Sequence, residues 1–294
     1  MKKILLLGAT GFIGSNIARE LDRQQRPWVG IARHPKDEAN PVFTLDDEVE
    51  ILSVLEESPV VINALGGLKP RDFEQDLNRA MEEFWSSLQR VLGLLRKAPP
   101  AALLQISSAG TVYGEAQGRP NVESDPASPH SWYGRMKVVE EALFQQFAHD
   151  KEVIYTCARV TNPFGNEDHP THGLVDVLID HVLSKKLFCA RFHPSACRDY
   201  IYAPEMGRAL VAMADKRLPG IYNIGSGESV NLRELVQMAQ NLVSEAKIVI
   251  AEPSKEDVVI SSVSVRRFRE EIGFTIGGPT AQEYLYDKLS QVTA

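Results

Sequence analysis

Short apolar runs alternate with longer amphipathic stretches through the first half of the chain. The runs have the length of buried strands, and they occupy residues 3–7, 28–32, 59–63, 102–107 and 153–159. The stretches between them carry apolar residues at helical spacing, and they cover 12–23, 47–57, 73–96 and 132–149. Strands that alternate with helices predict right-handed crossovers and an α/β fold, a doubly wound parallel sheet covered by helices on both faces.

The pattern changes beyond about residue 161, where prolines and glycines interrupt the chain. Shorter elements follow: helices near 174–185 and 204–214, strands near 199–202 and 220–224, a helix that opens after Asn231, and final helices over 263–272 and 281–289. We therefore expect a sheet domain over residues 1–160, to which some later elements return. Residues 161–294 are expected to form mainly a smaller C-terminal lobe.

Composition and charge narrow the class of protein. Hydrophobic residues make up 44% of the 294, enough for a real core, but no apolar run is long enough to cross a bilayer. The apolar run after Lys2 and Lys3 is shorter than the core of a secretory signal. The net charge of −7 argues against a nucleic-acid partner. Three cysteines are too few for a disulfide framework, so we expect a reduced, soluble, cytoplasmic protein.

Residues 8–14, Gly-Ala-Thr-Gly-Phe-Ile-Gly, follow the first predicted strand directly and open the first predicted helix. Glycines at such a turn let backbone N–H groups approach a pyrophosphate, whose charge the helix N-terminus also favours. A purely structural turn is the alternative, but the strand and the amphipathic helix supply the context that the motif requires. The loop therefore predicts a dinucleotide site, with candidate contacts at Gly8, Thr10, Gly11, Phe12, Ile13 and Gly14.

The end of the second predicted strand bears on the choice of cofactor. An acidic residue there would bind the ribose 2′-hydroxyl of NAD, whereas an arginine suits the 2′-phosphate of NADP. The sequence has Arg33 and His34 at this place and no acid. NADP is therefore favoured and NAD remains possible, since Arg33 as an ordinary solvated arginine is the alternative.

Tyr133 and Lys137 lie four residues apart, on one face of a predicted helix. A lysine close to a tyrosine favours the phenolate, so that the tyrosine can exchange a proton with a substrate hydroxyl. The pair follows the fourth predicted strand and its hydroxyl-rich end, which includes Ser108 and Thr111. Open α/β sheets place their chemistry at the carboxyl ends of strands, so this position makes Tyr133 and Lys137 catalytic candidates.

Six segments occur in a fixed order: GATGFIG (8–14), ISSAGTVYG (106–114), YGRMK (133–137), RVTNPFG (159–165), RDYIY (198–202) and GIYNIG (220–225). Together they resemble the extended short-chain dehydrogenase/reductase family, the NAD-dependent epimerase/dehydratase group acting on nucleotide sugars, from residue 3 to about 275. The resemblance implies a Rossmann domain, a smaller lobe that binds the nucleotide sugar, and hydride transfer between a nicotinamide and a sugar carbon, commonly C4.

The resemblance also implies roles for single residues. Tyr133 would be the general acid/base, and Lys137 would hold the nicotinamide ribose and tune the tyrosine. Asn78 matches an asparagine near the cofactor, Asn162 an asparagine near the substrate diphosphate, and Arg198 an arginine that contacts phosphate. Family members pair their two long helices across a dimer interface, so the resemblance implies a homodimer.

The sequence departs from the family pattern at four sites. Ala109 stands where the family has its catalytic serine or threonine. Gly110 and Thr111 replace the aspartate–glutamate pair of dehydratases, which makes a dehydratase unlikely on chemical grounds. Residues 254–257 lack the second diphosphate arginine, for which Lys255 is the candidate replacement. Residues 203–205 read Ala-Pro-Glu where Val-Asp-Asp is common.

The hydroxyl missing at Ala109 leaves a choice between Ser108, Thr111 and a water. Regular strand alternation would put Thr111 on the face of Ser107 and Ala109, whereas a bulge at Gly110 would swing Ser108 inward, so both side chains remain candidates.

No metal site is expected. The set Cys189, His193 and Cys197 lacks a fourth ligand at a convincing spacing, and the set His169, His172 and Asp176 fits a polar loop that begins a helix. Residues 46–48 fit a helix N-terminus.

The features together favour an NAD(P)-dependent enzyme acting on a nucleotide-diphosphate sugar. An NADPH-linked 4-keto reductase is slightly favoured by Arg33 and the modest chain length, and an NAD-linked 4-epimerase is the alternative. A non-catalytic NADP-sensing or scaffold protein on the same fold is a third hypothesis, supported by Ala109 and opposed by the intact Tyr133 and Lys137.

Overall fold

The computed structural model describes residues 3–35, 40–57, 59–166, 172–252 and 258–291. The chain divides into two compact units, each made of three segments. Unit 1 comprises Met1–Ser108, Ser131–Arg159 and Gly207–Tyr222, and unit 2 comprises Ala109–His130, Val160–Met206 and Asn223–Ala294.

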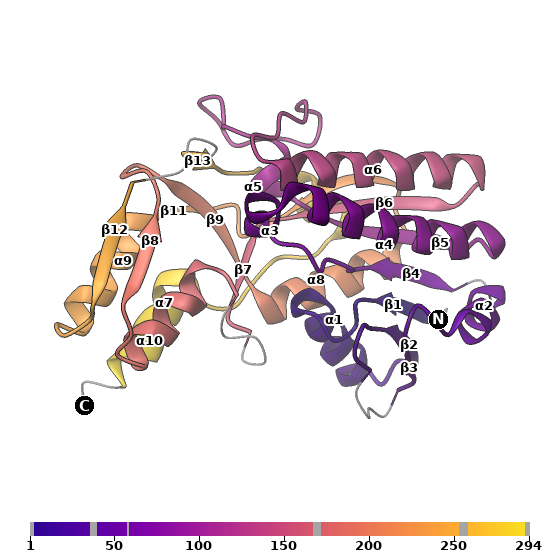
Figure 1. Cartoon of the computed structure of the whole chain (residues 1–294), viewed down its shortest axis with the longest axis horizontal. Coiled ribbons are helices and arrows are strands. Elements are labelled where there is room, and N and C mark those ends of the chain that lie inside the picture. Colours follow the sequence, from indigo (N-terminus) through magenta and orange to yellow (C-terminus); the bar gives the residue numbers. More distant parts are fainter. Residues whose placement is uncertain (1–2, 36–39, 58, 167–171, 253–257, 292–294) are drawn as a thin grey trace. The chain divides into compact units, whose positions relative to one another are not determined.

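A seven-stranded sheet forms the centre of unit 1, in the order β10-β6-β5-β4-β1-β2-β3 (Figure 1). Its strands are β1 (Ile4–Leu7), β2 (Trp28–Ile31), β3 (Val42–Phe43), β4 (Val60–Asn63), β5 (Ala102–Ser108), β6 (Ile154–Val160) and β10 (Gly220–Ile224). The pairs β1/β2, β1/β4, β2/β3 and β4/β5 are all parallel. Every residue of β1, β2 and β4 is buried, because helices cover both faces of the sheet. The predicted α/β fold is confirmed.

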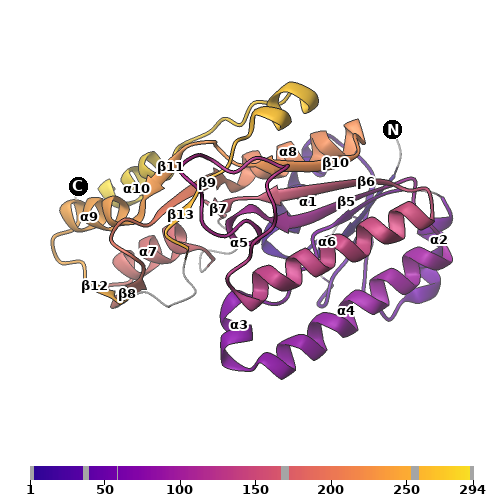
Figure 2. The same cartoon turned by 90° about the horizontal axis from the view of Figure 1, so that it is seen from above.

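The helices of unit 1 are α1 (Phe12–Arg23), α2 (Glu48–Glu56), α3 (Pro70–Gln75), α4 (Leu77–Lys97), α6 (Trp132–Asp150) and most of α8 (Ala203–Lys216). Side chains of α2, α4 and α6 share one apolar cluster with strand residues such as Leu5, Val61 and Leu103. Figure 2 shows α4 and α6 running side by side along the sheet. On α8, a Cβ at Gly207 would lie 2.5 Å from the backbone oxygen of Asn16, so only glycine allows this close approach to α1.

Ion pairs secure several helix ends of unit 1. Arg26, after α1, pairs with Asp215 of α8 at 2.8 Å, and Lys97, the last residue of α4, pairs with Glu48 of α2.

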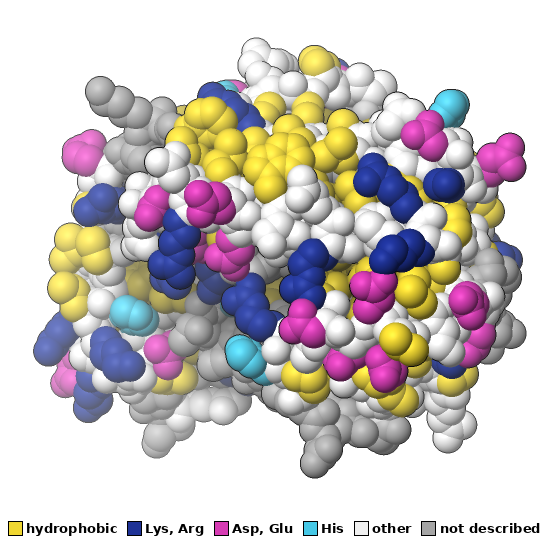
Figure 3. Space-filling view, turned by 45° about the vertical axis from the view of Figure 1, so that its right-hand side comes forward, with side chains coloured by type: hydrophobic (Ala, Val, Ile, Leu, Met, Phe, Trp, Pro, Cys, Tyr) yellow, Lys and Arg dark blue, Asp and Glu magenta, His cyan; other side chains and the backbone are white. Residues whose placement is uncertain are grey.

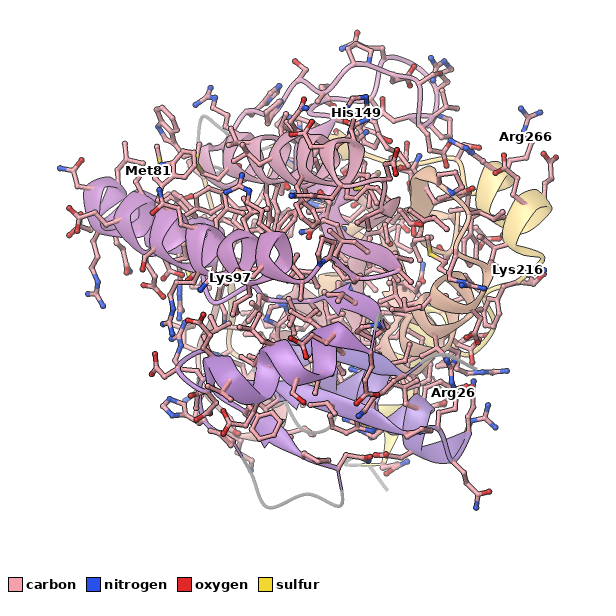
Figure 4. All side chains as sticks on the ribbon, turned by 90° about the vertical axis from the view of Figure 1, so that its right-hand side faces the viewer. Arg26, Met81, Lys97, His149, Lys216 and Arg266 are labelled. Atoms are coloured by element: carbon pink, nitrogen blue, oxygen red, sulfur yellow. The ribbon has the colours of Figure 1, made fainter. Side chains whose placement is uncertain are left out.

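Figure 4 labels Arg26, Lys216 of α8, and Met81 and Lys97 toward the two ends of α4. Basic and acidic side chains also lie next to one another over much of the face in Figure 3, without a large area of one sign.

The stripe over 73–96 forms two helices, where the sequence pattern predicts one. Helix α3 begins at Pro70, and proline is well suited to the first position of a helix. The helix ends where the backbone becomes extended at Asp76 (φ −152°, ψ 92°). The Asp76 side chain then accepts a hydrogen bond from the backbone N–H of Arg79 and caps α4. The break therefore follows from a local capping signal that apolar periodicity does not reveal.

Unit 2 has short strands and a helical core. In one sheet β9 (Cys197–Tyr202) lies between β11 (Ser229–Asn231) and β13 (Ile260–Ser261). Strand β7 (Asn162–Phe164) also pairs with β9. The pair β8 (Phe188–Arg191) and β12 (Ile248–Ala251) is separate and parallel. The helices are α5 (Ala109–Val112), α7 (Leu174–Leu183), α9 (Leu232–Leu242) and α10 (Ala281–Ser290), and the last three share one apolar cluster.

The prediction of a helix over 263–272 is wrong for the first half of this segment. Val263 instead forms a parallel bridge with Asn121, and the backbone N–H of Ser264 donates to the Asn121 carbonyl. Only Phe268–Ile272 is assigned as a π-helical turn, after two helical residues. Pairing with a distant segment outweighs the local periodicity here. Among all described residues, no helix is both long and apolar enough to span a membrane.

Candidate active site

The glycine loop lies at the carboxyl end of β1. Gly8 has a left-handed backbone (φ +82°), and its N–H donates to the Ile31 carbonyl at 2.7 Å. A Cβ at Gly8 would lie 2.5 Å from the Ala64 oxygen, and one at Gly14 would lie 2.0 Å from the Gly8 oxygen. Both positions therefore require glycine. Helix α1 starts after Gly11, which has no side chain to cap it, so an anion can take the place of a cap.

A cavity of about 270 Å³ lies within unit 1, beside this loop. In the sheet, Leu7 is level with Ile31 of β2 and Asn63 of β4, and both of these neighbours line the cavity. The remaining wall comes from the segments after β2, β3 and β4, from Phe73 of α3, and from α4 and α6. The glycine loop is not part of the lining. It follows β1, however, and β1 lies between β2 and β4, whose carboxyl ends do line the cavity. The glycine loop and the adjoining cavity therefore fit a dinucleotide, with a pyrophosphate at the loop.

Tyr133 and Lys137 both line this cavity, from the first two turns of α6. Ser131 caps the helix by accepting a hydrogen bond from the Gly134 N–H at 3.1 Å. The ring of Phe73, on α3, meets the Tyr133 ring edge-on, with 6.2 Å between the ring centres. The phenol of the tyrosine and the ammonium of the lysine therefore face the same space, as their spacing predicts.

Lys137 is paired within its own helix. Its Nζ lies 2.7 Å from Oε2 of Glu140 and 3.5 Å from the carbonyl oxygen of Ile106, and both side chains of the pair are about nine-tenths buried. Burial works to lower the pKa of Lys137, but the Glu140 carboxylate and Tyr133 outweigh it, so that this pKa is raised. The lysine therefore carries its charge at neutral pH. Sequence reasoning missed Glu140, although its i,i+3 spacing was a usable signal.

A buried polar network holds α6 against the sheet. Glu141 accepts hydrogen bonds from the Ser107 hydroxyl of β5 and from the Arg159 guanidinium of β6, the latter at 2.7 and 3.1 Å. Charge-assisted, bidentate contacts of this kind fix both distance and orientation. The network therefore positions the helix that carries Tyr133. It also commits Ser107 to a structural role, which sequence reasoning did not foresee.

Arg33 reaches the same cavity, where the sequence predicts a 2′-phosphate contact. One of its terminal nitrogens, Nη2, lies 3.1 Å from Oε1 of Glu83 on α4. A Cβ at Gly67 would lie 2.4 Å from that nitrogen, so the side chain crosses directly over this glycine. His34 is exposed and does not line the cavity.

The two hydroxyl candidates near Ala109, Ser108 and Thr111, are both half-buried as residues. The strand β5 ends at Ser108, and residues 109–112 turn into the short helix α5, so the alternation expected from an extended strand does not reach Thr111. The Thr111 hydroxyl oxygen is buried and has no hydrogen-bond partner among the described residues. Ser108 is only half-buried, and Ala109 is buried.

A second cavity, of about 280 Å³, lies within unit 2. It includes both predicted substrate contacts, Asn162 and Arg198, together with Arg191 and His172. The Asn162 amide donates to the Asp199 carbonyl at 2.9 Å, and Arg198 donates to the carbonyls of its neighbour Cys197 and of Val259. Two of the lining residues are arginines, which suits a phosphate-bearing ligand.

Asp199 stands between two residues of this lining, Arg198 and Tyr200, and is itself buried. Its carboxylate accepts hydrogen bonds from the backbone N–H groups of Ser226 and Gly227 at 3.0 and 2.9 Å. Burial raises the pKa of Asp199 to about 6, against the opposing effect of these donors.

Other sequence candidates lie elsewhere. Asn78 is exposed at the start of α4 and does not line the first cavity. His169 and Lys255 lie outside the described residues. Over the described parts of the chain, no three or more His, Cys, Asp or Glu side chains are grouped to hold a metal ion.

Two curated proteins that resemble this chain along most of its length are enzymes named for nucleotide-sugar substrates. The chain is 23% identical over 291 residues to the dTDP-4-dehydro-6-deoxyglucose reductase of Escherichia coli, covering 92% of each. It is 28% identical over 260 residues to the dTDP-6-deoxy-L-talose 4-dehydrogenase (NAD(P)(+)) of Kitasatospora kifunensis, covering 80% of this chain and 77% of that protein.

Solved structures share the fold. The UDP-glucose 4-epimerase of Thermotoga maritima, solved with UDP-glucose, superposes with a TM-score of 0.86 at 21% identity and covers 99% of both chains. MoeE5, solved with UDP-glucuronic acid and NAD, superposes with a TM-score of 0.84 at 25% identity and covers 99% of this chain and 98% of its own. A family model matches residues 4–225, and the chain therefore belongs to the NAD dependent epimerase/dehydratase family.

Proposed function

We propose that this protein is an NADPH-linked reductase of a 4-keto nucleotide-diphosphate sugar. The observation that carries the proposal is that Tyr133, Lys137 and Arg33 line one cavity beside the glycine loop. An acid/base pair and a cation suited to a 2′-phosphate thus share one site. The Escherichia coli reductase, matched over 92% of both chains, supports the same reaction class.

The residues divide the work of such a reaction. Bound NADPH would supply a hydride to the keto carbon of the sugar. The Lys137 ammonium binds ribose hydroxyls of the cofactor, and the Tyr133 hydroxyl gives its proton to the sugar oxygen as negative charge develops there. Proton and hydride together convert the ketone to an alcohol. Asn162 and Arg198 are proposed to hold the diphosphate of the sugar nucleotide, with Arg191 beside them in the second cavity.

A 4-epimerase is the second candidate function. It is favoured by the Arg33–Glu83 ion pair, because a paired arginine offers less net charge to a 2′-phosphate. Such an enzyme would oxidise C4 with bound NAD and return the hydride to the other face of the keto sugar. A dehydratase is not proposed, since Gly110 and Thr111 cannot supply the acid and base for elimination.

One pair of measurements separates the two candidates. The dinucleotide that co-purifies is extracted and identified, and NADPH consumption is then followed at 340 nm with a dTDP-4-keto-6-deoxyhexose. An empty site and keto-sugar-dependent NADPH oxidation support the reductase. Tightly retained NAD, with interconversion of UDP-glucose and UDP-galactose and no net NADPH oxidation, would replace it by the epimerase. If no sugar nucleotide reacts in either assay, the non-catalytic hypothesis takes its place.

We also propose a homodimer, assembled through α4 and α6 as in the family that the sequence resembles. These helices lie side by side, and each carries a tryptophan that is about two-fifths exposed, Trp85 on α4 and Trp132 on α6. Sedimentation equilibrium tests this proposal, and a monomer at micromolar concentration would contradict it.

A further inference from the structure

We propose that Glu83 sets the cofactor preference of this protein, by competing with the 2′-phosphate of NADP(H) for Arg33. This inference rests on the proposed use of the first cavity as a dinucleotide site. The residue lies on α4, fifty positions away from Arg33 in the sequence. Glu83 is therefore distinct from the residue at the end of the second strand, which sequence patterns use to predict cofactor specificity.

The contact is specific in its geometry. The two side chains meet at 3.1 Å, and both belong to the cavity lining. The absence of a side chain at Gly67 is what lets Arg33 extend across to α4. Glu83 is about one-third exposed and Arg33 about two-thirds, so a ligand can reach the arginine while the glutamate holds it.

The charges of the whole cavity make the competition matter. Its described lining carries three cations, and each is paired with a carboxylate of the same lining: Arg33 with Glu83, Arg90 with Asp46, and Lys137 with Glu140. The lining therefore offers no excess positive charge. A 2′-phosphate brings about 1.5–2 further negative charges at neutral pH, and to contact Arg33 it must displace Glu83 or share the guanidinium with it.

Replacing Glu83 by Gln removes this competition and leaves a side chain of similar size. Affinity for NADPH should rise about two- to fivefold, the range expected for an ion pair at a partly exposed site. Affinity for NADH should change by less than about twofold, since its ribose carries no charge at the 2′ position. The variant should thus shift the NADPH/NADH preference without any change at Arg33.

A matched control is available one residue away. Glu82 lies on the same helix and is exposed, so Glu82→Gln makes the same change in net charge away from Arg33. Dissociation constants for NADPH and NADH are measured by isothermal titration on the unmodified protein, Glu83→Gln, Glu82→Gln, Arg33→Ala and the Arg33→Ala/Glu83→Gln double variant. A gain for NADPH alone, seen in Glu83→Gln but not in Glu82→Gln and lost in the Arg33→Ala background, supports the inference.

Other outcomes overturn it. Equal gains for both dinucleotides, a gain that survives in the absence of Arg33, or no gain at all would show that Glu83 does not compete for the arginine. A selective loss of NADH affinity would show instead that Glu83 receives the 2′-hydroxyl. None of these measurements uses a sugar nucleotide. A protein with the expected binding pattern that reduces no keto sugar therefore refutes only the proposed function, whereas failure to bind either dinucleotide refutes both.

Discussion

The Nζ of Lys137 and the Oε2 of Glu140 lie 2.7 Å apart, one helical turn from each other on α6. Both side chains are about nine-tenths buried, so neither charge is well hydrated. In such a pair the attraction offsets desolvation, and removing one partner leaves an unpaired buried charge. Glu140 therefore helps to keep Lys137 protonated at the place where the cofactor ribose is expected.

Glu140→Gln should destabilise the protein by about 1–3 kcal/mol and narrow its active pH range. The pKa of Lys137 is raised in the folded protein, so its stabilising contribution persists through neutral pH and is lost only in strongly alkaline solution. Without Glu140, the largest effect that opposes burial is lost and weaker ones such as that of Tyr133 remain, so the pKa of Lys137 should be lower and activity should fall at a lower alkaline pH. Urea unfolding and pH–rate profiles test this, with Glu82→Gln as the control. An unchanged alkaline limb would contradict it.

Tyr133→Phe removes the proton that the proposed reaction transfers directly. Turnover should fall by about 10²–10⁴-fold, while the affinity for NADPH stays nearly unchanged because the ring and its contact with Phe73 remain. Steady-state kinetics with a 4-keto sugar nucleotide and a separate titration of NADPH measure the two effects. Full turnover by the variant would remove Tyr133 from the mechanism.

Substitutions at Ser108 and Thr111 should differ in their effect on kcat, because both residues are half-buried but the Thr111 hydroxyl oxygen itself is buried. A substrate can approach the half-buried Ser108, so Ser108→Ala should lower kcat by about 10–10³-fold. The Thr111 hydroxyl is buried without a partner in the described structure, so Thr111→Val should cost little activity and should leave stability unchanged or raise it by about 1 kcal/mol. Kinetics and thermal unfolding of both variants decide this. The reverse order of effects on kcat would assign the donor role to Thr111.

Arg33→Asp should reverse the cofactor preference. The new carboxylate would repel the 2′-phosphate and, beside Glu83, would add a second negative charge to this part of the cavity lining. NADPH should bind at least about tenfold more weakly, and NADH should become the tighter ligand. Fluorescence titration with both dinucleotides measures this. Equal affinities in the unmodified protein would remove the basis for the expectation.

Asp199 should make stability depend on pH. Its pKa is raised in the folded protein to about 6, so folding binds a proton that the unfolded chain releases near pH 4. The stabilisation from this group, on the order of 2–3 kcal/mol, is full below about pH 4 and is lost as the pH rises through 6. Asp199→Asn should therefore cost more unfolding free energy at pH 4.5 than at pH 7.5. Urea unfolding at the two values tests this, and an equal or opposite difference would contradict it.

Local signals explain why the α/β fold was predicted correctly and why the candidate site residues could be proposed. The strands around β1, the glycine turn and the tyrosine–lysine spacing depend on residues a few positions apart, and the structure places Tyr133, Lys137 and Arg33 at one cavity. Where pairing with a distant segment competes with a local preference for helix, the apolar pattern of the sequence predicts the wrong element. Pairing with Asn121 converts the start of the predicted helix over 263–272 into extended chain. Asn78, assigned from the resemblance, is exposed and away from the cavity lining.

The sequence by itself determined the parallel sheet, the glycine loop and the family, because apolar periodicity and motif spacing are properties of neighbouring positions. The Lys137–Glu140 pair is local to one helix, but only the tertiary structure decided the partners of Arg33 and of Glu141. Glu83 meets Arg33 across fifty positions, and Glu141 meets Ser107 across thirty-four. Such pairs form when separate helices and strands pack together, and no periodicity within either segment encodes the partner. The charge balance of the cavity is therefore a result of packing.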